Sequence, residues 1–238
     1  MTRIQPLDPL EPNRFPDPRD ALADPNGLLA FGGDLSPQRL VAAYTRGIFP
    51  WYSDGDPLLW WSPDPRCVFA TDAVHRSRSL AKFLRKCTWQ WSMNGAFDEV
   101  MRECAAPRED QQGTWITPDM ITAYTNLHML GYAHSLEVWD GDTLVGGLYG
   151  VAVGKMFSAE SMFSRRTNAS KIALHALAQT LRGRGFPLID AQVPNPHLLR
   201  MGARGMPRAR FLATLAHLAA EPAPQDWPRA RTPTRELL

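Results

Sequence analysis

Two apolar segments of this chain carry acidic or amide side chains where a buried strand would normally hold apolar ones. Glu160 lies in MFSAESMFS, and Asp190 and Gln192 lie in LIDAQV. Buried carboxylates are costly unless they are paired or hydrogen-bonded. The two runs flank the same expected helix, so they could lie side by side in one sheet. Residues 190 and 192 would then share one face, and two carboxylates and an amide would converge on one pocket, a candidate reaction centre.

A second interpretation gives these side chains only structural roles. Asp190 would cap a neighbouring loop, and Glu160 would pair with Arg165 or Arg166. The residues alone leave both interpretations open.

A second candidate site is basic. Residues 75–86, HRSRSLAKFLRK, contain five cations and no acid, although the whole chain has a formal net charge of only +2. On a helix, residues 78, 82 and 85 fall on one face, which makes a plausible phosphate-binding stripe. A solvated basic face is the commoner alternative. The five cations are Arg76, Arg78, Lys82, Arg85 and Lys86.

Other common reaction centres are missing from the sequence. The six histidines show no HxH or HExxH spacing, and the three cysteines form no CxxC pair, so we expect no metal site. A GxSxG motif is also absent, and we find no covalent nucleophile. Such sparse cysteines fit a reducing compartment. No apolar run approaches about 18 residues, and no secretory signal is evident, so we expect a cytoplasmic protein.

The elements that must position the candidate centre are a meander of strands and several helices. Residues 134–164 predict three antiparallel strands with turns at Gly141 and Gly154, and residues 186–193 predict a short buried strand. The final residues, 221–238, look loosely ordered. Helices are expected at 36–47, 75–86, 94–104, 117–131 and 168–185, the last capped by Asn168, and in a final segment that carries Phe211, Leu212, Leu215 and Leu218.

The order of these elements suggests an α+β protein with two domains. From about residue 75 it resembles half of the acyl-CoA N-acyltransferase-like sandwich called GNAT. The glycine-free segment SRRTNASK replaces the pyrophosphate loop of such enzymes, so acetyl-CoA is a poor candidate cofactor. A proline-rich junction near residue 64 predicts a domain boundary that divides the chain into residues 1–64 and residues 65–238.

The loop GIFPWYSDGDPLLWWSP, residues 47–63, holds five aromatic residues. Either these rings are buried at the domain junction, or some of them are exposed and stack on a planar ligand.

Long strings of the chain resemble leucyl/phenylalanyl-tRNA–protein transferases. They are GLLAFGGDLSPQRLVAAYTRGIFPWY, WWSPDPRCVF, TWITPDM, AYTNLHMLGYAHSLEVW, LVGGLYGVAVGKMFSAESMFS, NASKIALHAL and LIDAQVPNPHLLRMGA. The resemblance covers roughly residues 15–215 and is specific, because GDL…AY..GIFPW and F..ESMFS are rare strings. One departure is Ala191, where many members carry Cys.

The resemblance implies an enzyme that moves Leu or Phe, with Met as a further donor, from aminoacyl-tRNA to the α-amino group of proteins that begin with Arg or Lys. The product is an N-degron that a protease adaptor recognises. The implied fold is a small N-terminal domain against a GNAT-like domain, without cofactor or metal. We expect a cytoplasmic monomer whose partners are aminoacyl-tRNA and the acceptor protein, with no membrane contact.

The resemblance also implies a catalytic set of Asp190, Gln192 and Glu160. The reaction needs a nucleophilic amine, an ester held nearby and a stabilised oxyanion. Asp190 would orient Gln192 or the attacking ammonium, and Gln192 would hydrogen-bond the reacting amine or carbonyl. Glu160 would attract the cationic acceptor terminus. A literal general-base role for Gln192 is doubtful, because an amide is a feeble base.

The substrate-binding residues are implied in the same way. Trp51 and Trp115 would lie beside the terminal adenosine of the tRNA, where stacking is worth roughly 1–3 kcal/mol, and Trp60 and Trp61 would pack the junction. The basic stripe would hold acceptor-stem phosphates. The donor side chain would occupy an apolar pocket. The alternative is that the residues assigned to this pocket are ordinary core. They are Leu148, Phe157, Met162, Leu174, Leu177 and Ile189.

Two rival functions are compatible with the sequence. An acyl-CoA-dependent N-acyltransferase would bind a CoA column, and a tRNA-binding module without catalysis would bind tRNA but transfer nothing.

Overall fold

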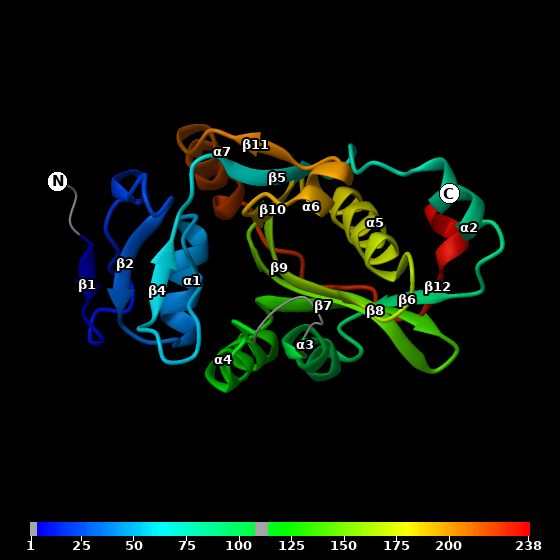
Figure 1. The fold of residues 1–238 in the computed structure, drawn as a ribbon, viewed down its shortest axis with the longest axis horizontal. Helices are drawn as coiled ribbons and strands as arrows, with labels where there is room; N and C mark the ends of the chain where they lie inside the picture. Colours follow the sequence, from blue (N-terminus) through cyan, green and yellow to red (C-terminus); the bar gives the residue numbers. More distant parts are fainter. Residues whose placement is uncertain (1–3, 108–113) are drawn as a thin grey trace.

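The structure, a computed structural model, describes residues 4–107 and 114–238. These residues form two β-sheets with helices around them, an α+β architecture as expected (Figure 1). The smaller sheet has the strand order β1-β2-β4-β3 and is covered by α1 (Pro37–Thr45). Its strands are β1 (Gln5–Leu7), β2 (Leu28–Gly32), β3 (Phe49–Pro50) and β4 (Leu59–Trp61), and a short 3-10 helix spans Pro18–Asp20.

The larger sheet begins after the proline-rich junction and has the order β11-β5-β10-β9-β8-β7-β6-β12. The predicted meander is confirmed: β7, β8 and β9 pair antiparallel in sequence, and Gly141 and Gly154 hold positive φ angles at the turns. The strands are β5 (Arg66–Ala70), β6 (Gln90–Met93), β7 (Ala133–Asp140), β8 (Thr143–Val153), β9 (Met156–Ser164), β10 (Leu188–Gln192), β11 (Arg204–Met206) and β12 (Thr232–Pro233).

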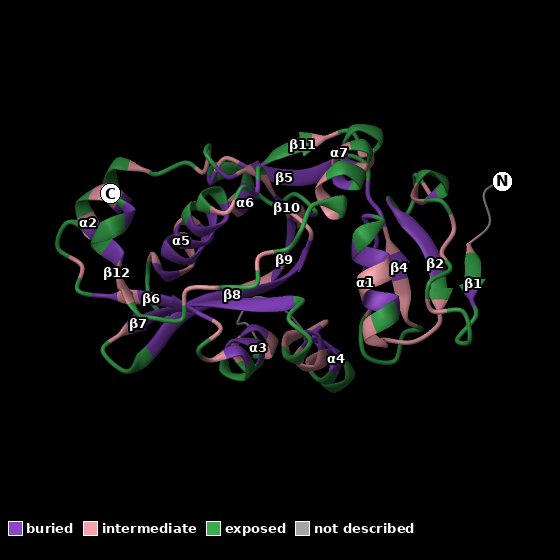
Figure 2. Cartoon of the chain, turned by 180° about the vertical axis from the view of Figure 1, so that it is seen from behind, coloured by how far each residue is buried: buried purple, intermediate pink, exposed green. Residues whose placement is uncertain are grey.

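Helices cover both faces of the larger sheet, so its central strands are buried (Figure 2). On one face lies α5 (Ala169–Gly183), and on the other lie α3 (Phe97–Ala105) and α4 (Pro118–Met129) (Figure 1). The remaining helices are α2 (Arg78–Leu84), α6 (Pro196–Arg200) and α7 (Arg208–Ala220). Two apolar clusters fill the space on either side, and the candidate site lies where β9 and β10 separate them.

Capping side chains fix where several helices begin. Ser36 and Thr117 each accept a hydrogen bond from the third backbone N–H of the following helix, as their positions predict. Ser77 does the same for α2, so the helix expected at 75–86 covers only Arg78–Leu84. Asn168 is the N-cap residue of α5, as predicted, but it adopts a left-handed conformation with φ 76° and its side chain makes no capping hydrogen bond.

The expectation of a loosely ordered tail is wrong. The backbone N–H of Thr234 donates to Trp89 O at 2.9 Å, and Leu237 is buried in a short 3-10 helix, Thr234–Leu237. The Trp227 ring lies 4.2 Å from that of His134, centroid to centroid. These long-range contacts order a segment whose local composition suggests a coil. Within residues 4–107 and 114–238, no helix has the length and apolarity needed to cross a bilayer.

Candidate active site

The structure brings Glu160, Asp190 and Gln192 together. Strands β9 and β10 are parallel neighbours, with Asp190 in register with Ser158, two residues before Glu160. Gln192 Nε2 donates to Glu160 Oε1 at 2.7 Å, and the backbone N–H of Gln192 donates to Asp190 Oδ1 at 2.9 Å. Asp190 is fully buried, and the other two are 9% exposed. Two carboxylates and an amide therefore form one connected group.

A local irregularity of β10 aims the Gln192 side chain. The register against β5 shifts between Asp190 and Gln192, and Gln192 has a φ of 61°. Such left-handed angles are uncommon for residues other than glycine and cost on the order of 1–3 kcal/mol. The hydrogen bond from the Gln192 backbone to Asp190 stabilises this conformation. Bulges of this kind commonly redirect a side chain next to an active site.

Asp190 is closed off from substrates. Its two carboxylate oxygens accept from Arg66 Nε at 2.8 Å and Arg66 Nη2 at 2.7 Å, and Ser158 Oγ donates at 3.2 Å. Both side chains of the ion pair are 1% exposed. Of the two roles considered for Asp190, this geometry fits the orientation of Gln192 and leaves no room for contact with an ammonium.

Arg66 is a site residue that sequence reasoning missed. Its guanidinium carbon lies 4.7 Å from the ring centroids of both Phe49 and Phe211, and Nη1 donates to Gly47 O at 3.1 Å. It therefore joins the loop of the smaller sheet to the centre of the larger one. The available signal was a lone arginine in the apolar strand RCVFA, which required a buried acid as partner.

The alternative pairing of Glu160 with arginine is wrong. Arg165 forms two hydrogen bonds to the carboxylate of Glu103, with Nε to Oε2 at 2.7 Å, and Arg166 pairs with Asp140. Both arginines follow Ser164, the last residue of β9, and each is paired with another acid. The chain therefore leaves Glu160 without a cationic partner among the described residues.

Two buried tyrosines complete the surroundings of Glu160. Tyr124 OH donates to Glu160 Oε2 at 3.3 Å and forms a short hydrogen bond with Tyr44 OH. Burial raises the pKa of Glu160 to about 8; hydrogen bonding from the phenols opposes the rise, and the charge of Asp190 adds to it. Burial also raises the pKa of both tyrosines well above the ordinary value, so they stay neutral donors.

A cleft of about 1090 Å³ reaches this group. Glu160 and Gln192 line it, Trp51 and Trp115 form part of its wall, and Leu148, Met162 and Leu174 contribute apolar surface. Three residues expected to line it with them are not among its lining residues: Phe157, Leu177 and Ile189 are fully buried in the apolar cluster between the sheet and α5. Their strand and helix positions face that core, so the core interpretation holds for them.

The aromatic loop divides between the two roles considered for it. Trp60 is fully buried, donates to Gly32 O at 2.9 Å and packs against Phe15. Trp61 Nε1 donates to Trp51 O at 2.6 Å, and its ring lies 5.8 Å from the Trp51 ring. Trp51 itself remains 42% exposed. Trp60 and Trp61 therefore support the loop, and Trp51 presents a ring to the cleft.

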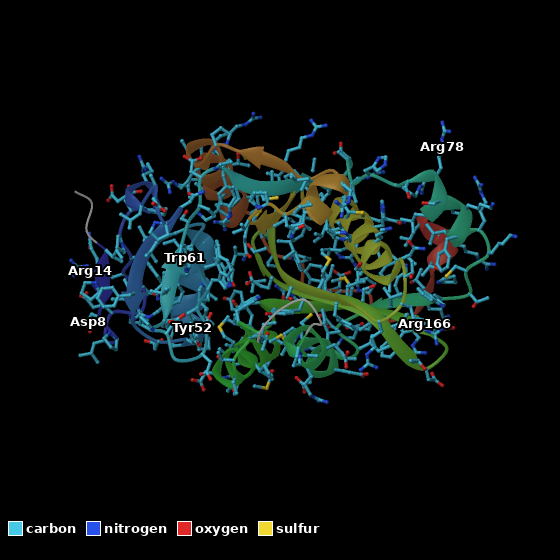
Figure 3. The ribbon with its side chains drawn as sticks, viewed as in Figure 1. Asp8, Arg14, Tyr52, Trp61, Arg78 and Arg166 are labelled. Atoms are coloured by element: carbon cyan, nitrogen blue, oxygen red, sulfur yellow. The ribbon has the colours of Figure 1, made fainter. Side chains whose placement is uncertain are left out.

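The basic stripe lies away from the cleft. Figure 3 places Arg78 at the end of the molecule opposite Trp61, and none of its five residues belongs to the described lining of the cleft. Arg76 precedes α2 and donates to the backbone oxygen of Leu237, so it ties down the tail. Arg85 and Lys86 follow the last helical residue. The residues that the structure describes also contain no group of three or more His, Cys, Asp or Glu able to hold a metal ion.

Comparison with known proteins gives consistent results over nearly the whole chain. A family model described as leucyl/phenylalanyl-tRNA protein transferase matches residues 68–216, and the model of its N-terminal domain matches residues 33–64. The chain is 56% identical over 214 residues to a Shewanella baltica (strain OS185) protein, and the alignment covers 90% of each chain. It is 60% identical over 215 residues to a Xanthomonas oryzae pv. oryzae (strain MAFF 311018) protein, and that alignment covers 90% of this chain and 86% of the relative. Both relatives are described as leucyl/phenylalanyl-tRNA–protein transferase.

Three solved structures align with the chain only weakly. L-PGS from Bacillus licheniformis aligns with a TM-score of 0.39 and 10% sequence identity, covering 73% of this chain and 56% of that one. Similarity at this level is too low to support a conclusion about either fold or chemistry.

Proposed function

Because the chain belongs to the leucyl/phenylalanyl-tRNA–protein transferase family, we propose that its cleft joins the two substrates of that reaction beside Glu160 and Gln192. The chain is an aminoacyltransferase that moves Leu or Phe from aminoacyl-tRNA to the N-terminus of a protein. The observation that carries the assignment of the site is the joint presence of Glu160, Gln192 and two cleft tryptophans around one cavity.

The donor occupies the apolar part of the cleft. Its terminal adenosine stacks on Trp51 and Trp115, and its side chain contacts Leu148, Met162 and Leu174. Leucine and methionine side chains adapt their shape, which suits a pocket for Leu and Phe and for Met as a third donor. Such a pocket separates Leu from Val weakly, by about 1–3 kcal/mol per methylene, but rejects charged side chains.

The acceptor is a protein that begins with Arg or Lys, and its modified N-terminus is an N-degron. The amide of Gln192 donates through Nε2 to Glu160, so its Oε1 is the atom available to accept from the incoming α-ammonium. The carboxylate of Glu160 attracts that same cation. Asp190 does not touch the substrates and acts through Gln192, because it holds the Gln192 backbone in its left-handed conformation.

The surrounding assignments follow from the same function. Residues 1–64 form a small N-terminal domain, and 65–238 form a GNAT-like catalytic domain. The stripe on and around α2 binds acceptor-stem phosphates, which adds affinity without reading the tRNA sequence. The protein acts as a monomer in the cytoplasm and needs no cofactor.

One assay tests the proposal. Labelled Leu-tRNA is mixed with the protein and with peptides that are identical except for an N-terminal Arg or Ala. We expect labelled product from the Arg peptide and none from the Ala peptide. Equal labelling of both would contradict the acceptor assignment, and no transfer by well-folded protein would contradict the function. A CoA-dependent enzyme would instead require an acyl-CoA, and a binding module would retain tRNA without forming product.

A further inference from the structure

Glu160 has an unusual set of neighbours for a buried carboxylate. Gln192 Nε2 donates to Oε1 at 2.7 Å, and Tyr124 OH donates to Oε2 at 3.3 Å. Tyr44, from the helix of the smaller sheet, holds Tyr124 through a hydrogen bond between the two hydroxyl groups. All of these donors are neutral, and an ionised carboxylate has about four acceptor positions. Glu160 therefore keeps acceptor capacity on the side that lines the cleft.

Asp190 provides the contrast that decides which acid can accept a proton. Its oxygens accept from both nitrogens of the Arg66 fork, from Ser158 and from the Gln192 backbone. Protonation of Asp190 would leave a buried guanidinium without its counter-ion, a loss that typically costs several kcal/mol. Protonation of Glu160 leaves no cation unpaired, because its donors are an amide and a phenol.

We propose that Glu160 takes a proton from the α-ammonium of the acceptor, and that Tyr124, held by Tyr44, is the positioning residue that fixes the carboxylate for this step. The inference rests on the proposed function and adds the group that makes the amine nucleophilic. Tyr44 comes from α1, so the N-terminal part of the chain contributes to the reaction centre without touching substrate.

The proposed step is balanced without any further reagent. One ammonium proton passes to the carboxylate of Glu160, and the freed nitrogen lone pair attacks the ester carbonyl carbon. The new C–N bond forms, the bond from that carbon to the ribose oxygen breaks, and the ribose oxygen leaves with the second proton of the nitrogen. Glu160 then releases its proton to solvent. The products are the amide, the uncharged tRNA and one proton.

The charges around Glu160 support its role. The groups that face it are Tyr44 on α1, Tyr124 on α4, Tyr149 on β8, Arg66 on β5 and Asp190 on β10. Burial raises the pKa of Glu160 to about 8, which is close to the ordinary value of an α-amino group, about 7.7–8.0. Proton transfer between groups of matched pKa is efficient. An ammonium arriving beside Glu160 favours its charged form.

The test compares the wild type with Glu160→Gln in single-turnover transfer from Leu-tRNA to the Arg peptide between pH 6 and 9. Glutamine keeps the size and the contact with Tyr124 but accepts no proton. We expect a loss on the order of 100-fold at pH 7. The loss should shrink as pH rises toward 9, because a free amine needs no base. A Glu160→Asp variant should keep the pH profile of a carboxylate even where its rate is lower.

A Tyr124→Phe variant tests the positioning role. Removing the hydroxyl removes a donor to the carboxylate, so the acid limb of the rate profile should move to higher pH, and Tyr44→Phe should move it in the same direction. A merely structural role would lower the rate equally at every pH.

The outcomes separate the two proposals. An active wild type whose Glu160→Gln profile runs parallel to it, with the same deficit at pH 6 and pH 9, overturns the inference alone. A wild type inactive toward the Arg peptide at every pH overturns the proposed function, and the inference with it.

Discussion

Strands β7 and β9 flank β8 in the larger sheet, and each buries one glutamate in its middle. Glu137 on β7 accepts from Ser92 Oγ at 2.6 Å and Ser135 Oγ at 2.5 Å, and from the backbone nitrogens of Gly95 and Ala96 at 3.4 Å. It lies at the start of α3, whose N-cap residue, Ala96, has no capping side chain. Glu137 thus caps a helix from a neighbouring strand.

Glu160 on β9 differs in two respects. Its carboxylate accepts from two donors, both side chains, whereas that of Glu137 accepts from four, two side chains and two backbone nitrogens. Glu160 also lines the cleft, whereas Glu137 has no exposed surface. Burial raises the pKa of both carboxyl groups. Burial alone therefore does not identify a reactive acid. A complete set of donors marks a structural carboxylate, and an incomplete set at a cleft marks one that can exchange protons with a substrate.

The largest expected effect is on the pH dependence of stability. The pKa of Glu160 rises from 4.5 to about 8 on folding, so the folded protein binds more protons in that range, and the free energy of unfolding falls as pH rises through it. The full difference is as much as about 5 kcal/mol. The Glu160→Gln variant should lack this pH dependence of the free energy of unfolding. At pH 9 it should therefore unfold at a higher urea concentration than the wild type. Urea denaturation at pH 5, 7 and 9 measures it, and parallel curves for both proteins would contradict the comparison.

Asp190 extends the comparison to a carboxylate with a cationic partner. Asp190→Ala leaves Arg66 buried and unpaired, so we expect the free energy of unfolding to fall by about 3–5 kcal/mol. Replacing the pair by apolar residues, Arg66→Met with Asp190→Leu, should recover most of the stability but not the transfer activity, because Gln192 loses its backbone acceptor. Guanidinium denaturation and the peptide assay provide the two readouts. A fall in the free energy of unfolding of less than about 1 kcal/mol in Asp190→Ala would mean that the ion pair is accessible to solvent.

Parts of this arrangement could be predicted from the sequence. The apolar runs around Glu160 and Asp190 have the lengths and flanking turn residues of strands, so β9 and β10 could be predicted. Because one helix, α5, connects the two strands, they could also be predicted to be neighbours. Arg66 could not be assigned, because it is 124 residues from Asp190 in the chain. The same holds for Tyr44 and Tyr124, which are 80 residues apart. Local patterns do not specify which distant donor meets a buried acid.

The donor pocket shows a second limit of sequence reasoning. Leu148 and Leu174 line the cleft, but Leu177 on the same helix and Ile189 on the neighbouring strand do not. All four are apolar residues in elements that were expected. Which of them faces the cleft depends on how α5 and β10 pack together, and this is decided by tertiary contacts. The tail was misjudged for the same reason, since Trp227 and Leu237 pack against distant elements.

Glu137→Gln is the matched partner of Glu160→Gln. The amide NH₂ of glutamine would face donors that need an acceptor, so the free energy of unfolding should fall by about 1–3 kcal/mol at pH 7. Transfer per folded molecule should match the wild type, because Glu137 does not reach the cleft. Thermal melting and the Arg-peptide assay, normalised to folded protein, measure the two effects. A selective loss of transfer with unchanged melting would reverse the roles assigned to the two glutamates.

The smallest expected effect asks whether function extends beyond the cleft to α2. Replacing Arg78 and Lys82 with Ala removes two exposed cations at the far end of the molecule (Figure 3). If they contact phosphates, tRNA binding should weaken, and the slope of log K against log salt should become shallower by about 0.9 per cation. Transfer from a short aminoacyl-adenosine donor should not change, because that donor ends at the cleft. Arg14, which lies at the opposite end in Figure 3, and Arg19 have side chains that are 77% and 74% exposed, and replacing both with Ala gives a control with the same change of charge. If the two double variants alter the salt slope of tRNA binding equally, α2 contributes only general electrostatic attraction. The specific contacts with tRNA then lie at the cleft.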